Sequence, residues 1–441
     1  MSFPRGFFFG AATSAYQIEG GTAADGRGPS WWDDFAQVPG HIADGSNGEV
    51  ACDHYRLWRD DVALMQRLGL NAYRLSIAWP RVMPRGRGPV NPAGLDFYER
   101  LVDALLQAGI APFVTLYHWD LPSALAARGG WQSRDTAQAF AEYASVVARR
   151  LGARVRSWAT LNEPRCSAVV GHLEGRHAPG LRSMQATLQA AHHLLLAHGL
   201  GVQALRAELP GTEIGIVCDV KPYTAAGSEA ADVQAVRRGD GFFNRWFLDP
   251  LFKASYPSDI AAELAPWMPV QGSDDLRIIA APIDSLGINY YTRGHVRHDA
   301  TRPYPHTTEE RVPGAHYSAM GWEDYPQGLH HMLLRIHREY APAQLYVAEN
   351  GAAEDDVPAP GGRVHDAARV RYFQGHWAAA ARALADGVPL RAYFAWSLLD
   401  NFEWGHGYRK RFGIVHVDFA TQQRTPKDSA LAYRDFIAGL R

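Results

Sequence analysis

Two glutamates stand where the chain could perform acid–base chemistry. Glu163 lies in the segment TLNEP (160–164) and Glu349 in the segment AENG (348–351), and each follows a short apolar run. A protonated carboxyl group can give a proton to a leaving oxygen, while an ionised one supplies electron density to the carbon that loses it. Either glutamate alone could instead cap a helix or pair with an arginine. The pair therefore predicts chemistry only if the fold brings both side chains together.

The runs that carry these glutamates belong to a regular alternation of strand-like and helix-like segments. Strands are predicted at residues 7–12, 72–77, 111–117, 155–161, 213–218, 285–290, 344–348 and 390–396. Between them, residues such as Trp58, Val62 and Met65 recur on one helical face, and Ser133 suits the N-cap of a helix that runs to Leu151. Glycines follow several of these helices, as left-handed caps favour. This order is typical of parallel βα units and favours an α/β fold, a closed (β/α)8 TIM barrel.

The domain organisation predicted from the sequence is simple. No linker or compositional break interrupts the chain, so residues 1–441 are expected to form one domain. Long βα loops are predicted at about residues 293–326 and at residues 354–366. Loops of this kind shape the active site of a barrel.

The carboxyl ends of the predicted strands carry polar and aromatic side chains that a barrel would gather at one rim. They are Gln17, Glu19, Arg74, His118, Trp119, Asn162, Glu163, Asn289, Tyr291, Glu349 and Trp396. Most of the predicted strands end in such a side chain, so a separate structural role for each is a poor explanation. Two carboxyl groups among these side chains suit glycoside hydrolysis. In a retaining reaction the two carboxyl groups would lie about 5–5.5 Å apart.

Composition excludes several classes of protein. The formal net charge is −2, which gives no reason to expect nucleic acid or anionic lipid as a partner. No apolar stretch approaches the roughly 18 residues of a membrane span. The 3 cysteines are odd in number and form no CxxC pair, so reduced thiols in a cytoplasmic protein are expected. Neither a cofactor nor a bound metal is expected, and the oligomeric state stays open.

Seven short segments, taken together, carry a resemblance. They are FFFGAATSAYQIEG (7–20), YRLSIAWPR (73–81), TLYHWDLP (115–122), TLNEP (160–164), GINYYT (287–292), YVAENG (346–351) and WSLLDNFEW (396–404). In this order and spacing they resemble glycoside hydrolase family 1, the β-glucosidase family, over essentially the whole chain. One departure is Ala348, where the family often has threonine before the nucleophile.

The resemblance implies a double displacement at two catalytic glutamates. Glu163 would protonate the departing glycosidic oxygen, and Glu349 would attack the anomeric carbon to form a glycosyl-enzyme. Glu163 would then accept a proton from the attacking water. Arg74 and Tyr291 are expected to stabilise the Glu349 carboxylate, while Glu163 keeps the higher pKa, partly because Glu349 is a nearby negative charge.

The resemblance also implies how a sugar is held. The side chains expected to hydrogen-bond its hydroxyls are Gln17, His118, Asn162 (at the 2-hydroxyl), Glu403 and Trp404. Trp396 would form a stacking floor, with Trp119 and Phe412 shaping the pocket and Asn289 supporting the polar groups. Trp322 is similar to the tryptophan that borders the leaving-group side. For Phe412 and Trp322, simple packing is the alternative.

The expected substrate is a small β-glucoside such as cellobiose, as in cellulose degradation. Glu403 beside Trp404 favours an unphosphorylated sugar, because a carboxylate would repel a phosphate; Lys410 and Arg411 are read as a solvated basic pair. Three alternatives stay open at this point. They are broad β-galactosidase and β-fucosidase activity, a non-catalytic sugar-binding homologue, and a metal-dependent barrel hydrolase suggested by the 19 histidines.

Overall fold

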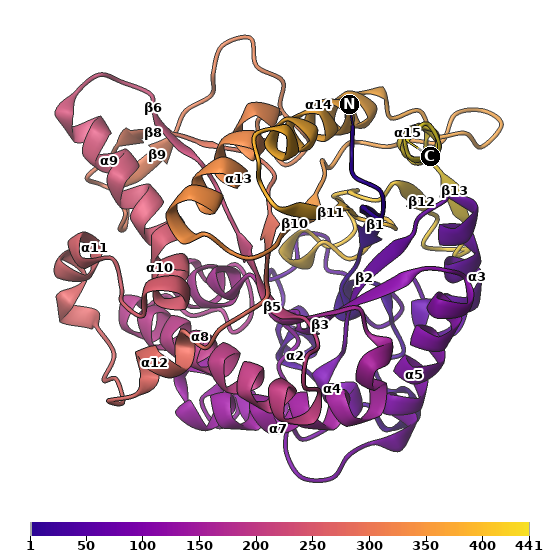
Figure 1. The fold of residues 1–441 in the computed structure, drawn as a ribbon, viewed down its shortest axis with the longest axis horizontal. Helices are drawn as coiled ribbons and strands as arrows, with labels where there is room; N and C mark the ends of the chain where they lie inside the picture. The colour runs from indigo at the N-terminus through magenta and orange to yellow at the C-terminus, as the bar shows by residue number, and fades with distance from the viewer. Residues whose placement is uncertain (1, 441) are drawn as a thin grey trace.

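Eight parallel strands close into a barrel within residues 2–440, the part of the chain that the computed structural model describes (Figure 1). Around the barrel they are β1 (Phe8–Ala12), β11 (Leu390–Trp396), β10 (Leu345–Asn350), β7 (Ser285–Asn289), β5 (Ile214–Asp219), β4 (Ser157–Asn162), β3 (Ala111–Tyr117) and β2 (Ala72–Ser76). Each predicted strand is found within two residues of its predicted ends. The (β/α)8 fold is therefore confirmed.

Helices surround the ring of strands, as Figure 1 shows. The longer ones are α3 (His54–Arg67), α5 (Pro92–Gln107), α7 (Arg134–Leu151), α8 (Met184–Glu208), α9 (Ala230–Asp240), α10 (Trp246–Lys253), α13 (Pro326–Tyr340), α14 (Ala367–Ala385) and α15 (Asp428–Ala438). Shorter ones are α1 (Ala15–Ile18), α2 (Trp31–Ala36), α4 (Trp79–Val82), α6 (Ser123–Ala126), α11 (Ser258–Glu263) and α12 (Asp275–Ile279). Two π-helical turns, η4 (Cys166–Glu174) and η5 (Gly241–Arg245), and the 3-10 turns η1 (Ala24–Gly26), η2 (Gly130–Gln132), η3 (Gly152–Arg154), η6 (Ala265–Trp267) and η7 (Trp404–His406) complete the set.

The predicted helical faces are the buried ones. In α3, Trp58, Val62 and Met65 are all buried, so this stripe packs towards the barrel. Gly69 follows α3 at φ +69°, a left-handed conformation that glycine adopts without a Cβ clash. Ser133 occupies the N-cap position of α7, as predicted.

Aromatic side chains fill the barrel interior below the carboxyl rim. The ring of Phe113 lies 5.4 Å from that of Phe8, 5.0 Å from that of Phe394 and 5.9 Å from that of Tyr346. Such edge-on ring contacts are typical of a packed core. The barrel is therefore closed at this level, and a site can open at the carboxyl ends of the strands.

One of the two predicted loops is more ordered than expected. Residues 293–326 contain β8 (Gly294–His298) and β9 (Thr307–Glu309), which form a small sheet with β6 (Tyr223–Ala225). These short strands depend on a distant partner, so local propensity could not reveal them. The loop at 354–366 has only the isolated bridges Glu354↔Arg411 and Pro358↔Val364. A second small sheet pairs β12 (Val415–Val417) with β13 (Arg424–Pro426).

The first strand and its preceding residues pack against α15 near the end of the chain, close to α14 (Figure 1). The rings of Phe3 and Phe436 lie 5.9 Å apart, and the Tyr433 hydroxyl donates to the carbonyl of Gly10 at 3.1 Å. The arrangement of residues 1–441 as one domain stays a prediction. Among residues 2–440, every helix is too short or too polar to cross a membrane.

Candidate active site

A cavity of about 1060 Å³ opens at the carboxyl ends of the barrel strands. The predicted site residues that line it are His118, Trp119, Glu163, Asn289, Tyr291, Trp322, Glu349, Trp396, Glu403, Trp404 and Phe412. Gln17, Arg74 and Asn162 are buried and contact the residues of this wall. The structure thus brings the predicted set together. Glu19, also expected at the rim, pairs instead with Arg81 at 2.8 Å.

Strand register places the key side chains at one level. Asn289 at the end of β7 is paired with Asp219 of β5 on one side and with Glu349 of β10 on the other. Ala12 of β1 is paired with both Arg74 of β2 and Trp396 of β11. Asp219, Asn289 and Trp396 end their strands and Glu349 is next to the end of β10, so these side chains face one cavity. Arg74 lies two residues before the end of β2, just below them.

Glu349 is held by a cation and a phenol. Its Oε1 accepts a hydrogen bond from Arg74 Nη1 at 2.6 Å, and its Oε2 accepts one from the Tyr291 hydroxyl at 2.6 Å. Burial raises the pKa of Glu349, while the charge of Arg74 and the hydrogen bond from Tyr291 oppose that rise. These contacts favour the ionised carboxylate that a nucleophile needs.

Asn162 links the two carboxyl groups through a buried polar chain. Its Oδ1 accepts from Arg74 Nη2 at 2.6 Å and from Asn289 Nδ2 at 3.1 Å. Its Nδ2 lies 3.0 Å from Nε2 of His118. Burial, followed by the charge of Arg74, lowers the pKa of His118 well below its usual value, so His118 is neutral and can accept this hydrogen bond. The chain fixes the orientation of the Asn162 amide.

Glu163 meets a different environment from Glu349. Asn289 Nδ2 donates to Glu163 Oε1 at 2.7 Å, and a neutral amide does little to stabilise a charge. Burial raises the pKa of Glu163 well above its usual value, with further contributions from the negative charges of Asp219 and then Glu349. The expected effect of Glu349 is present, but Asp219 contributes more. These surroundings favour the protonated carboxyl group.

Asp219 was missed by the sequence analysis, although it directly follows the predicted fifth strand (213–218) and ends the observed one, β5. The strand-end rule that identified the other side chains would have found it. One carboxylate or thiol atom from each of Glu163, Cys166 and Asp219 lies within 4.8 Å of the others, a spacing that could hold a metal ion. A cation already occupies this corner, because Arg165 Nε donates to Asp219 Oδ2 at 2.5 Å and its Nη2 lies 3.2 Å from Cys166 Sγ. We therefore assign no metal to it.

Three residues of the cavity wall adopt left-handed backbone conformations that non-glycine residues rarely take. They are Trp119 (φ +77°), Glu163 (φ +45°) and Trp404 (φ +48°). Strain of about 1–3 kcal/mol at each such residue persists only where the surroundings impose it. The Trp119 carbonyl accepts from Trp31 Nε1, and the Trp119 indole donates to the carbonyl of Asn162 at 3.0 Å. These bonds hold the rim in a fixed shape.

Aromatic rings form part of the cavity wall. The Trp404 ring lies 4.5 Å from that of Trp119 and stacks on Tyr16 at 6.0 Å. The His118 ring stacks on Trp396 at 5.7 Å. Flat rings of this kind suit the apolar C–H faces of a sugar.

Glu403 and Gln17 form a polar end of the cavity. Gln17 Nε2 lies 3.0 Å from both Asn401 Oδ1 and the Phe402 carbonyl, and 3.4 Å from Glu403 Oε2. Burial and then the charge of Glu349 raise the pKa of Glu403 to about 8, against a lowering by Gln17. An acceptor with few protein donors around it is suited to binding the hydroxyls of a ligand.

Trp322 lines the cavity beside Tyr291 and Phe412. Its ring is 5.3 Å from that of Tyr291 and 6.0 Å from that of Phe412. The following residue, Glu323, forms two hydrogen bonds with Arg293, at 2.8 and 2.9 Å. This ion pair anchors the loop that carries Trp322.

An aromatic-walled cavity with two buried carboxyl groups, at the carboxyl end of a barrel, places the protein in the class of barrel glycoside hydrolases. The family model for glycosyl hydrolase family 1 matches residues 1–439. Beta-glucosidase A of Thermotoga maritima is 46% identical over 437 residues, covering 99% of this chain and 97% of the relative. The beta-glucosidase of Agrobacterium sp. is 46% identical over 439 residues, covering 99% of this chain and 95% of the relative.

The solved structures agree with the sequence relatives. The Thermotoga maritima beta-glucosidase in complex with glucoimidazole superposes with a TM-score of 0.97 at 45% identity, covering 100% of this chain and 99% of that one. This protein belongs to glycosyl hydrolase family 1. The predicted class, a retaining β-glycosidase, is thereby confirmed.

Proposed function

We propose that this protein is a β-glucosidase that removes terminal non-reducing β-D-glucosyl residues from short β-glucosides such as cellobiose. Glu349 is the nucleophile and Glu163 the general acid and base. The observation that carries the assignment is the contrast in their partners. Glu349 lies 2.6 Å from the Arg74 guanidinium, whereas Glu163 is held by the Asn289 amide. One carboxyl group is thus set up to be ionised and the other to be protonated.

In the first step, Oε2 or Oε1 of Glu349 attacks the anomeric carbon, and the bond to the leaving oxygen breaks with its electron pair. The proton of Glu163 passes to that oxygen, so the departing group leaves as an alcohol. Because Asn289 donates to Oε1 of Glu163, the proton belongs on Oε2. As the ester forms, the Glu349 carboxylate loses its negative charge to the new bond, and the hydrogen bonds from Arg74 and Tyr291 to it weaken.

In the second step, water attacks the anomeric carbon of the glycosyl-enzyme. Glu163, now a carboxylate, accepts a proton from this water, and the ester bond to Glu349 breaks. In the ester Glu349 has no charge, and the pKa of Glu163 falls. When the ester is hydrolysed, the Glu349 carboxylate is regenerated and the pKa of Glu163 rises again. Both groups return to their starting states, and two inversions give net retention.

The bound sugar is recognised by hydrogen bonds at one end and aromatic faces below. Glu403 and Gln17 bind the hydroxyls remote from the anomeric carbon, and Asn162 and His118 bind those near it. Trp396 provides the stacking floor. The 2-hydroxyl contact of Asn162 strengthens as positive charge develops at the anomeric carbon.

The substrate is unphosphorylated. Lys410 Nζ donates to the carbonyl of Ala319 at 2.6 Å, and Arg411 Nη1 to Asp400 Oδ2 at 2.7 Å. Both cations already have protein partners, and Glu403 faces the cavity where a 6-phosphate would lie. A phosphate there would either meet the ionised Glu403 as a like charge or hold Glu403 protonated, and neither arrangement supplies the cation that a phosphate needs.

We propose that the same site also hydrolyses β-fucosides. A relative from Bifidobacterium breve, 45% identical over 460 residues, is named a bifunctional beta-D-glucosidase/beta-D-fucosidase. It covers 99% of this chain, which spans 98% of that relative.

The three cysteines, Cys52, Cys166 and Cys218, are buried and free, which supports a reducing compartment such as the cytoplasm.

The test is turnover of four p-nitrophenyl glycosides: the β-D-glucoside, β-D-galactoside, β-D-fucoside and 6-phospho-β-D-glucoside. We expect strong hydrolysis of the glucoside, and its loss in E349Q. Cleavage of the 6-phosphate alone would overturn the reading of Glu403. Failure to cleave any of them, with sugar binding intact, would make the protein a binding homologue.

A further inference from the structure

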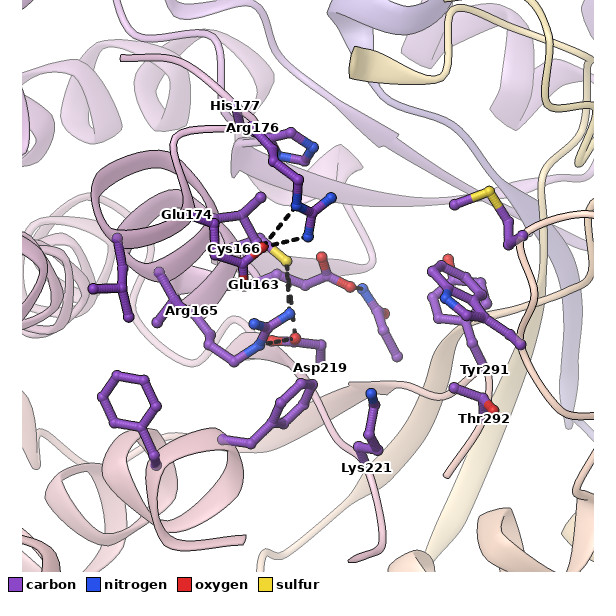
Figure 2. A pocket seen from close by; sticks show the side chains of 18 of the residues that line it. Glu163, Arg165, Cys166, Glu174, Arg176, His177, Asp219, Lys221, Tyr291 and Thr292 are labelled. Carbon is purple, nitrogen blue, oxygen red and sulfur yellow. Dashed lines mark hydrogen bonds and ion pairs between the residues drawn. The ribbon is translucent and has the colours of Figure 1, made fainter. Parts of the chain in front are cut away.

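A third carboxylate stands beside the general acid. Asp219 is the last residue of β5, and its carboxylate lies with Glu163 and Cys166 in a group whose ligand-capable atoms are within 4.8 Å of one another. Figure 2 shows Glu163, Cys166 and Asp219 converging at one side of the cavity, with Arg165 beside them. Asp219 is only 9% exposed, so little water screens its charge from Glu163.

Arg165 is fixed against this third carboxylate. Its Nε donates to Asp219 Oδ2 at 2.5 Å, and its guanidinium lies 3.9 Å from the ring centre of Phe243. Burial lowers the pKa of Arg165, but the carboxylate of Asp219 more than offsets this and raises it. The guanidinium is therefore a permanent cation that reduces the field Asp219 exerts on Glu163.

We propose that Asp219 and Arg165 are an opposed pair of positioning residues, in which Asp219 holds the proton on Glu163 and Arg165 limits how tightly it does so. The inference rests on the proposed function, because it concerns the acid of that reaction. Neither residue transfers a proton itself. Together they set the pH at which Glu163 stops acting as an acid.

Other titratable groups also face Glu163, and they are unchanged in all the variants compared below. Glu349 of β10 and Tyr291 after β7 lie across the cavity, and Cys218 of β5 and Cys166 of η4 lie on the near side. The two thiols have pKa values raised well above the usual range by burial, so they are neutral. Among these groups, Glu349 carries the remaining negative charge.

The pair predicts shifts of opposite sign. Removing the negative charge in D219N lowers the pKa of Glu163, so the alkaline limb of the pH profile moves to lower pH. Removing the positive charge in R165Q raises that pKa, so the limb moves to higher pH. Each shift should be about one pH unit, the usual effect of a charge at this range. A residue with a merely structural role would not reverse the sign.

The experiment measures kcat/KM against pH for phenyl β-D-glucoside, whose poor leaving group needs the acid. The variants are D219N, R165Q and the double variant D219N/R165Q, which removes the buried pair together and so avoids an unpaired charge. We expect the alkaline midpoints to rise in the order D219N, double variant, wild type, R165Q. R165K keeps the charge and should restore the wild-type midpoint more nearly than R165Q.

A matched control is another ion pair at the cavity wall, Lys221 with Glu309, at 2.6 Å. The double variant K221M/E309Q removes one charge of each sign, and neither residue is among the main groups that shift the pKa of Glu163. It should therefore leave the alkaline midpoint within about 0.2 pH unit of wild type. A midpoint unchanged in both D219N and R165Q, or moved in the same direction by both, would overturn the proposal.

A second readout does not need turnover. The carboxylic acid band of Glu163 in the infrared spectrum, identified by its loss in E163Q, reports protonation directly. Its midpoint should follow the same order among the variants. Absence of glucosidase activity in the wild type would reject the proposed function, while this titration would still decide whether Asp219 and Arg165 act on Glu163.

Discussion

Arg74 and Glu349 form an ion pair across the top of the barrel, with Nη1 of Arg74 2.6 Å from Oε1 of Glu349. Their strands, β2 and β10, are separated by β1 and β11 in the sheet, so closure of the barrel creates this contact. The side chains are 2% and 4% exposed, which leaves the charges little water to screen them. The pair therefore connects the fold directly to the ionisation of the proposed nucleophile.

Replacing Arg74 with methionine should lower kcat/KM about 10²- to 10³-fold, because breaking one side of a buried ion pair costs about 3–5 kcal/mol. The uncompensated carboxylate would take up a proton and lose its nucleophilicity. Steady-state kinetics with p-nitrophenyl β-D-glucoside measure this, and circular dichroism checks the fold. A folded R74M variant with activity within about threefold of wild type would contradict the role of Arg74.

Tyr291 provides a test through pH. Its hydroxyl donates to Oε2 of Glu349 at 2.6 Å and so lowers the pKa of that carboxyl group. In Y291F this stabilisation is lost, the pKa of Glu349 rises, and the acidic limb of kcat/KM moves to higher pH. We expect a movement of about 0.5–1 pH unit. A limb that stays in place or moves to lower pH would show that Tyr291 acts otherwise.

Glu163 should be required most where the leaving group is poor. In E163Q, hydrolysis of cellobiose should fall about 10²- to 10⁴-fold, the usual contribution of general acid catalysis. Formation of the glycosyl-enzyme from a 2,4-dinitrophenyl glucoside, whose leaving group needs no proton, should fall far less. The alkaline limb should also disappear. Equal losses for both substrates in pre-steady-state kinetics would argue against an acid role.

A buried charge cluster behind the sugar-binding segment predicts an effect on stability. Lys427 Nζ lies 2.5 Å from Asp356 Oδ2 and 2.7 Å from Asp400 Oδ1, and the lysine is fully buried. Burial raises the pKa of Asp400, but Lys427 and then Arg411 lower it below its usual value. The stabilisation from Asp400 is therefore present at neutral pH and is lost as pH falls through its folded pKa.

K427M should lower the free energy of unfolding by about 3–5 kcal/mol at neutral pH, because it leaves two buried carboxylates short of a cation. Urea denaturation measures this loss. K410M is the matched control, since the Lys410 ammonium donates to a neutral carbonyl, that of Ala319, and its loss should cost about 1 kcal/mol or less. A K427M variant as stable as K410M would contradict the assigned importance of the cluster.

The sequence was sufficient for the barrel and for most of the site because both depend on local pattern. Strand ends such as Asn162-Glu163 and Ala348-Glu349 follow apolar runs, and a barrel places strand ends together whatever the loops do. Asp219 could have been predicted by the same rule. Its importance could not, because it depends on how near it lies to Glu163.

Other features require three-dimensional distances. Nothing near Arg165 in the chain indicates that its guanidinium reaches Asp219, and nothing near Lys427 indicates that it lies between two aspartates. The strands β8 and β9 form because β6 lies beside β8, a tertiary effect that overrides weak local propensity. The polar chain through Asn162 likewise joins β2, β4 and β7 across the barrel.

The most direct test of the account is to trap the glycosyl-enzyme. Incubation with 2,4-dinitrophenyl 2-deoxy-2-fluoro-β-D-glucoside, followed by digestion and peptide mass spectrometry, should find one fluoroglucosyl group per chain, attached to Glu349. The E349Q variant should remain unlabelled, and E163Q should still be labelled with this activated reagent. A label on Glu163 or on another residue, or glucose released with inverted configuration, would contradict the assignment of Glu349 as the nucleophile.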